Sequence, residues 1–150
     1  MAADFLSTPI GDLWIFANEA KLLKIGFEKG KAVDKNAVTE RAIELLDAYF
    51  MDMRPDFSIL PLEFPKQPFY KKALKALLKT AYGSRLTYGD LAELAGNKNA
   101  YRAAASAVSH NPFAIAVPCH RVVHKSGGVG AYGWGASKKA WLLHHEEKTV

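Results

Sequence analysis

Four prolines within a short segment divide this chain into two parts. Proline has no backbone N–H and disfavours helical dihedrals at the residue before it, so neither a long helix nor a central strand can run through such a segment. The prolines are Pro55, Pro61, Pro65 and Pro68. We therefore predict a linker at about 54–67 between an N-terminal domain, 1–65, and a C-terminal domain, 68–150, a division that 150 residues permit.

The first part has the pattern of a small sheet covered by a helix. Apolar runs at 13–17 and 22–27, separated by the polar pair Asn18 and Glu19, predict a β-hairpin. Apolar residues at helical spacing then predict a helix from about 34 to 53 with one buried stripe. The stripe comprises Val38, Ala42, Leu45, Leu46, Tyr49 and Phe50.

The second part has the pattern of consecutive short helices. Pro68 is well placed to open a helix that ends near Gly83. Thr87 and Asp90 resemble a capping box that starts a helix over 88–95, and Gly96 stops it. Asn97 or Asn99 can cap a further helix over about 100–109. Two short helices joined by a glycine turn form the helix-turn-helix outline, although packed core helices share it.

The charge of the chain is concentrated in the second part. Residues 1–65 hold 7 basic and 11 acidic residues, whereas residues 66–150 hold 13 basic and 4 acidic ones, which together give the net charge of +5. A surface with that excess attracts polyanions, so nucleic acid is the leading class of partner. The alternative is a lysine-rich face that only meets solvent. No apolar stretch approaches the length needed to span a bilayer, which argues against a membrane partner.

The predicted second helix of the helix-turn-helix has few bulky side chains. Arg102 stands among alanines, and recognition helices that read the wide major groove usually carry several long polar residues. A helix of this composition suits a close approach to the minor groove, with arginine as its one long side chain. The alternative is a small-residue helix packed in the core.

The single cysteine lies in the segment 118–123, Pro-Cys-His-Arg-Val-Val, after an apolar run at 113–117 that predicts a buried strand. One cysteine can form neither an intrachain disulfide nor a multi-cysteine zinc site, which fits a reducing compartment. A lone cysteine is commonly a small buried hydrophobe, but His120 and Arg121 beside Cys119 create surroundings that favour a thiolate. Adjacent side chains on a strand point to opposite faces, so Cys119 and His120 can cooperate only on a turn or through a water.

The second part resembles the O6-alkylguanine-DNA alkyltransferases, also called methylated-DNA–protein-cysteine methyltransferases. The resemblance runs from about 80 to 147 and is carried by Asn111-Pro112, by Pro118-Cys119-His120-Arg121-Val122, by the glycine-rich stretch 127–132 and by 139–146. Tyr82-Gly83 and 87–92 also match, and 7–11 weakly resembles the family's N-terminal domain. The resemblance implies an α+β protein. It would have a small ribonuclease-H-like sheet-plus-helix domain and a mainly helical, winged-helix-like domain that contains the helix-turn-helix.

The resemblance also implies an activity: direct, irreversible transfer of an alkyl group from O6 of guanine, and less readily from O4 of thymine, to Cys119. In this scheme His120 acts as a base through a water, Glu146 orients its imidazole, Tyr88 donates a proton to the leaving base, and Asn111 ties the recognition helix to the active-site turn. The base pocket would be formed by Tyr88, Val122, Tyr132, Gly133 and Trp134. The residues implied for DNA binding are Tyr101, Arg102, Ala103 and Ser106, with Arg102 filling the stack vacated by a flipped nucleotide.

Further expectations follow from the same resemblance. The partner is double-stranded DNA that carries O6-alkylguanine, bound largely without sequence preference by a monomer in the cytoplasm, or in the nucleus if the source is eukaryotic. No cofactor and no metal ion are expected. Trp134 stands where some members have glycine, and we expect it to narrow the base pocket. Two other readings stay open, namely a DNA binder without activity, as a lesion sensor or a regulator, and a Cys/His hydrolase.

Overall fold

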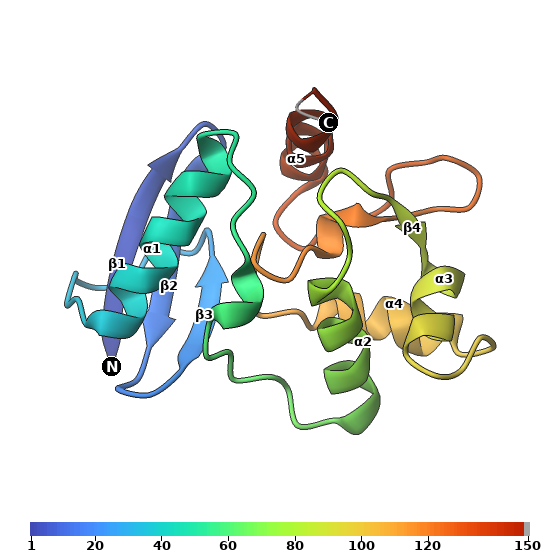
Figure 1. Ribbon diagram of the computed structural model, residues 1–150, viewed down its shortest axis with the longest axis horizontal. Helices are drawn as coiled ribbons and strands as arrows, with labels where there is room; N and C mark the ends of the chain where they lie inside the picture. Colours follow the sequence, from blue (N-terminus) through green and yellow to red (C-terminus); the bar gives the residue numbers. More distant parts are fainter. Residues whose placement is uncertain (149–150) are drawn as a thin grey trace. The chain divides into compact units, whose positions relative to one another are not determined.

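The computed structural model describes residues 1–148 of the chain, which fold into two compact units. The first unit comprises Met1–Glu63 together with Pro112–Ala116, and the second comprises Phe64–Asn111 and the residues from Val117 onwards. Sheet and helix in the first unit and mainly helices in the second make this an α+β protein, as expected (Figure 1). No helix in residues 1–148 is long and apolar enough to cross a membrane.

The first unit is a three-stranded antiparallel sheet with a helix on one face. Strands β1 (Ala2–Thr8), β2 (Gly11–Ala17) and β3 (Leu22–Gly26) lie in the order β1-β2-β3, and helix α1 (Ala37–Phe50) packs against β1 and β2. The predicted hairpin and helix are therefore confirmed. The sequence analysis missed strand β1, whose buried Asp4 breaks the simple apolar pattern.

The proline-rich segment is largely part of the first unit. Leu60 and Leu62 are buried, and a short 3-10 helix η1 spans Phe57–Ile59. The N–H of Leu22 donates to the carbonyl of Pro61 at 2.8 Å, and the N–H of Glu63 donates to the carbonyl of Leu22 at 2.9 Å. Because these bonds attach the segment to β3, the predicted linker at 54–67 is too long at its N-terminal end.

A second correction concerns the apolar run that leads to the cysteine. Residues 113–117 do not form the predicted strand, since only Phe113 pairs, through one parallel bridge to Ile25, and the chain then turns at Ile115 with φ 70°. The N–H of Ile25 donates to Pro112 and the N–H of Ala114 donates to Ile25, each at 2.9 Å. These contacts return 112–116 to the first unit, so the predicted C-terminal domain 68–150 is interrupted there.

The second unit contains the helix-turn-helix. Helix α2 (Pro68–Leu78) packs on α4 (Tyr101–Ser109), which also packs on α3 (Tyr88–Leu94). The short strands β4 (Leu86–Thr87) and β5 (Val122–Val123) pair in parallel. Helix α5 (Ala136–Lys148) packs against a 3-10 turn, η2 (Cys119–Arg121).

The helix ends predicted from the sequence are confirmed in part. The capping box of Thr87 and Asp90 is present. Gly83 is not the residue that ends α2, because α2 stops at Leu78 and Gly83 occupies a later turn with φ 80°. The N-terminus of α4 has no side-chain cap, since Asn97 accepts from the N–H of Asn99 instead.

Candidate active site

Cys119 lies at the start of η2, where the chain turns sharply between a buried loop and β5. Its side chain is 2% exposed, and its N–H donates to the carbonyl of Val117 at 2.8 Å. The amide of Asn111 donates to the same carbonyl at 2.9 Å and so fixes the entry to the turn. The 3-10 turn supplies the non-extended backbone that Cys119 and His120 need in order to serve one site.

Glu146 holds the ring of His120 through Nε2, the nitrogen on the opposite side of the ring from Nδ1. The ring is completely buried, and Nε2 lies 2.5 Å from Oε2 of Glu146. Nδ1 is buried and has no hydrogen-bond partner among residues 1–148. Burial lowers the pKa of His120, and the hydrogen bond to Glu146 only partly opposes this. A neutral ring with its proton on Nε2 therefore leaves the Nδ1 lone pair able to accept a proton.

Three groups from distant parts of the chain converge on Glu146. Its Oε1 accepts from the guanidinium Nε of Arg121 at 2.8 Å and from the N–H of Gly83 at 3.0 Å, while Oε2 meets His120. Burial alone would raise the pKa of Glu146, but the bonds to His120 and Arg121 reverse this and hold it well below its usual range. The carboxylate is thus charged and fixed in place. Neither Arg121 nor Gly83 was assigned to the site from the sequence.

Arg121 connects this carboxylate to the end of α2. Its Nη1 donates to the carbonyl of Thr80 at 2.9 Å and to the Thr80 hydroxyl at 3.2 Å. Its guanidinium carbon lies 5.9 Å from the centre of the Tyr82 ring. Arg121 therefore holds in place the Glu146 carboxylate, which in turn orients His120.

Lys139, like Arg121 and Gly83, was not assigned to the site from the sequence. It is completely buried on α5, and its Nζ donates to the carbonyl of Val122 at 2.6 Å and to the carbonyl of Ala131 at 3.1 Å. It has no carboxylate partner in the described chain. The carbonyl of Val122, one of the residues predicted for the base pocket, therefore already accepts a hydrogen bond from Lys139.

The sequence predicts electropositive surroundings that favour the thiolate form of Cys119, but the electrostatics of the buried site differ from this expectation. Burial raises the pKa of the thiol to about 11, and hydrogen bonding by Asn111 and the positive charge of Lys139 only partly offset this effect. Desolvation outweighs the neighbouring cations because the sulfur is enclosed. The thiol therefore needs a base during the reaction, and His120 is the buried base beside it in the chain.

Two tyrosines near the sulfur are kept protonated. Burial, with a smaller effect of Cys119, raises the pKa of Tyr88 above 10.0 and that of Tyr132 further. The hydroxyl of Tyr132 is buried without a hydrogen-bond partner among residues 1–148. Its ring meets the half-buried Trp134 edge-on, with 5.1 Å between ring centroids. Both hydroxyls are thus available as proton or hydrogen-bond donors.

A cleft of about 760 Å³, here called the α3–α4 cleft, opens beside these groups. Tyr88, whose pKa is raised by burial and by Cys119, is one of its lining residues. Its walls include Tyr88 and Glu93 of α3, Tyr101 and Ala105 of α4, and His124 and Lys125 after β5. His124 and Lys125 were not predicted as site residues.

The predicted DNA-binding residues all lie on α4. Tyr101 and Arg102 are exposed, and Ala103 is half-buried. Ser106 is not free, because its hydroxyl hydrogen-bonds the hydroxyl of Tyr70 on α2. Gly133 is exposed, and a Cβ added there would meet no atom within 4 Å, so nothing in its surroundings demands glycine.

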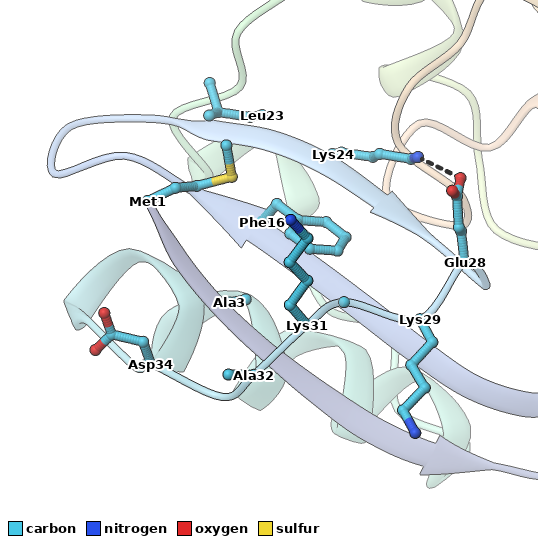
Figure 2. Close-up of a pocket in the computed structure, with 11 residues that line it drawn as sticks. Met1, Ala3, Phe16, Leu23, Lys24, Glu28, Lys29, Lys31, Ala32 and Asp34 are labelled. Carbon is cyan, nitrogen blue, oxygen red and sulfur yellow. Dashed lines mark hydrogen bonds and ion pairs between the residues drawn. The ribbon is translucent and has the colours of Figure 1, made fainter.

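A second hollow, of about 730 Å³, lies in the first unit, and Figure 2 shows its lining. Lys24 turns to Glu28, with 3.1 Å between Nζ and the carboxylate, and Lys31 and Phe16 also belong to the lining. Gly30 covers the sheet there so closely that a Cβ would lie 2.8 Å from the Trp14 ring. Lysines and carboxylates line this hollow, but neither a cysteine nor a histidine does, so it lacks the thiol and imidazole that the site around Cys119 combines. No metal-binding cluster of His, Cys, Asp or Glu occurs within 1–148 either.

Comparisons with known proteins agree with this site. Residues 68–148 match the DNA-binding domain of 6-O-methylguanine DNA methyltransferase, and residues 1–64 match its ribonuclease-like domain. A protein of Acanthamoeba polyphaga mimivirus named "Probable methylated-DNA--protein-cysteine methyltransferase" is 36% identical over 154 residues, which cover 100% of this chain and 99% of the relative. The methylated-DNA–protein-cysteine methyltransferase of Methanosarcina barkeri is 34% identical over 158 residues, covering 100% and 99%.

Solved structures show the same similarity. The O6-methylguanine methyltransferase of Mycobacterium tuberculosis has a TM-score of 0.87 and 31% identity, and covers 99% of this chain and 94% of its own. Mycobacterium tuberculosis OGT in complex with DNA has a TM-score of 0.89 and 30% identity, covering 100% and 95%. Both domain matches and the full-length relatives show that this chain belongs to the 6-O-methylguanine DNA methyltransferase family.

Proposed function

We propose that this protein repairs DNA by moving the alkyl group of O6-alkylguanine, and less readily of O4-alkylthymine, onto Sγ of its own Cys119. The coarser activity, that of a methylated-DNA–protein-cysteine methyltransferase acting on DNA, follows from the family and from the names of its full-length members. One observation carries the finer proposal. The buried His120 is fixed by Glu146 and keeps Nδ1 unbonded next to the only cysteine of the chain.

The reaction begins with removal of the thiol proton. His120 Nδ1 accepts this proton from Cys119 through one water molecule, and the Glu146 carboxylate stabilises the imidazolium that forms. Arg121 and the Gly83 N–H keep that carboxylate in place throughout. Because burial holds the Cys119 pKa at about 11, the thiol is protonated at rest and loses its proton only to this base.

The transfer is an in-line displacement at the alkyl carbon. The sulfur lone pair forms the S–C bond while the C–O6 bond breaks and its electrons remain on the guanine oxygen. Tyr88 donates its hydroxyl proton to the guanine and later regains one from the imidazolium through solvent. The thioether has no comparable leaving group, so the product is stable and each molecule reacts once.

The base must leave the duplex to reach a sulfur that is 2% exposed. Arg102, exposed at the first turn of α4, enters the minor groove and takes the place of the flipped nucleotide, while the small residues of α4 allow the close approach. Tyr132, Trp134 and the carbonyl of Val122 then line the base. Contacts of this kind recognise the lesion, so binding is largely independent of sequence.

All the groups of this scheme belong to one chain, which supports a monomer as the acting species. A free thiol as alkyl acceptor also supports action in a reducing compartment, the cytoplasm or a nucleus. No step of the scheme uses a cofactor.

The test is the intact mass of the protein, with peptide mapping, after incubation with a duplex that contains one O6-methylguanine. We expect a gain of one CH2 confined to the peptide with Cys119, and no gain in Cys119→Ser. Preferential binding of the lesion duplex without any mass gain would instead identify a lesion sensor. A mass gain at another residue would overturn the assignment of the nucleophile.

A further inference from the structure

Helix α2 and its flanks carry an unusual accumulation of positive charge. Between Phe64 and Gly89 the sequence contains no acidic residue but six basic ones: Lys66, Lys71, Lys72, Lys75, Lys79 and Arg85. Arg85 pairs with Glu147 at 3.2 Å. None of the five lysines has a carboxylate partner within residues 1–148.

The lysines are arranged unfavourably for the helix itself. Lys75 lies four residues from both Lys71 and Lys79 and three from Lys72, and like charges at these spacings repel each other. The buried side of α2 is formed by Ala73, Leu74 and Leu77, so packing does not require lysine at the exposed positions. Lys75 lies over the ring of Phe64, 5.6 Å from its centroid, but a cation–π contact does not neutralise its charge. A row of mutually repelling cations without carboxylate partners is stabilised when an anionic partner covers it.

Three of these lysines line a hollow. Lys72, Lys75 and Lys79, with Thr80, form one side of a groove of about 550 Å³ whose other side is Leu94, Ala95 and Gly96 at the end of α3. We call it the lysine groove. At 1.5 Å per residue, Lys72 and Lys79 are separated by about 10 Å along the helix. Phosphates of one DNA strand advance about 3.4 Å along the duplex axis, so the row spans about three of them.

The lysine groove is separate from the α3–α4 cleft. The two hollows have no lining residue in common, and α4 borders only the cleft. They also meet different parts of α3: Tyr88 to Glu93 line the cleft, and Leu94 and the two residues after it line the groove. DNA bound through α4 therefore leaves the groove lysines unpaired.

We propose that the lysine groove binds the phosphate backbone of a second duplex segment while α4 holds the first. This inference rests on the proposed function only in taking DNA as the partner. Charge complementarity selects the occupant, because a polyanion with regularly spaced charges matches a row of unpaired lysines on a protein whose partner is already DNA. Two surfaces of this kind let the protein pass directly from one segment to another while it searches for lesions.

The test measures how fast the protein leaves a fluorescently labelled, undamaged duplex after mixing with increasing concentrations of unlabelled duplex. If a second segment binds before the first is released, the observed dissociation rate constant rises in proportion to competitor concentration. We expect this rise in the wild type and its loss in K72Q/K75Q/K79Q. The triple variant K29Q/K31Q/K35Q removes the same charge from exposed lysines of the first unit and should behave like the wild type.

Further readouts separate the possible outcomes. Each neutralised phosphate contributes about 0.9 to the slope of log K against log salt, so K72Q/K75Q/K79Q should lower the slope for the second duplex by about 2.7. In K72Q/K75Q/K79Q, alkyl transfer from a short lesion duplex should stay at the wild-type rate. If the wild type itself failed to transfer the alkyl group, that result would contradict the proposed function and not this inference. A wild-type dissociation rate independent of competitor would overturn the inference. Loss of affinity for the first duplex in the groove variant would also overturn it, in favour of one continuous interface.

Discussion

Replacing Glu146 by Gln tests the buried network that is proposed to activate Cys119. The change keeps the size of the side chain and one carbonyl oxygen for a hydrogen bond, but removes the charge that Arg121 and His120 meet at 2.8 and 2.5 Å. The adjacent Glu147 provides a matched control. It lies on the same helix, its side chain is 70% exposed, and it pairs with the partly exposed Arg85 at 3.2 Å.

The structure sets the size of the expected effects on stability. Removing one partner of a buried ion pair costs about 3–5 kcal/mol, and we expect the lower end because Arg121 keeps its bonds to Thr80. For a chain of this size, about 3 kcal/mol corresponds to a decrease in Tm of about 6–12 °C. The Glu147→Gln variant breaks only a surface pair, so it should lose about 1 kcal/mol or less.

The same change should slow the chemistry. A hydrogen bond to a charged group contributes about 1.5–3 kcal/mol, and Glu146 makes this bond to the His120 imidazolium in the transition state. The loss corresponds to a transfer rate constant lower by about 10- to 150-fold. Single-turnover rapid-quench assays with an O6-methylguanine duplex would measure it. If Glu146→Gln melted earlier than the wild type but transferred methyl at the wild-type rate, Glu146 would be a structural residue and the proposed base would be wrong.

Three further predictions concern other parts of the site. Trp134→Gly should raise the rate for O6-benzylguanine relative to O6-methylguanine duplexes, since the indole meets Tyr132 at 5.1 Å and is expected to narrow the proposed base pocket; equal ratios in both proteins would refute this. Arg102→Ala should slow transfer from duplex DNA by about tenfold, equivalent to 1.4 kcal/mol, and leave reaction with free O6-benzylguanine unchanged; an equal loss with the free base would contradict its role in flipping. Acid should destabilise the fold: the native pKa of His120 lies below 6.5 and that of Glu146 below 4.5, so the unfolded chain binds more protons and Tm should fall below pH 6.5 and further below pH 4.5. A Tm unchanged between pH 7 and 4 would oppose the burial of these groups.

Local signals in the sequence predicted most of the helices. The stripe of α1 and the Thr87–Asp90 capping box depend on residues three or four positions apart. The capping box is present, and of the predicted stripe Ala42, Leu46 and Tyr49 are buried, whereas Val38, Leu45 and Phe50 are half-buried. The same reasoning failed at 113–117, where an apolar run turns back to pair once with Ile25. That outcome depends on a partner 88 positions away along the chain, which no local pattern contains.

The sequence predicted the reactive residues of the candidate site but not the long-range hydrogen bonds that hold them in place. Cys119 and His120 stand in a recognisable motif, and the resemblance to the family also implied Glu146. In contrast, the Gly83 N–H reaches Glu146 across 63 positions, and Lys139 reaches the Val122 carbonyl across 17. Gly83 was interpreted as a helix-ending residue because glycine commonly has that role. Only the tertiary structure shows that its backbone N–H serves a buried carboxylate.

The composition of helix α5 shows why its buried charged residues, Lys139 and Glu146, gave only a weak pattern in the sequence. Along with Leu142 and Leu143, it buries Lys139, His145 and Glu146, so its polar residues do not gather on the solvent side. A helix that only packs would place apolar side chains at these positions, because an enclosed charge is unfavourable unless it is bonded. Here both charges are bonded to the turn that carries Cys119 and to the strand that follows it, Glu146 through His120 and Arg121, and Lys139 through Val122. In this fold, buried charges on a helix with little amphipathic pattern therefore distinguish a helix that holds the groups proposed to activate Cys119 from a helix that only packs.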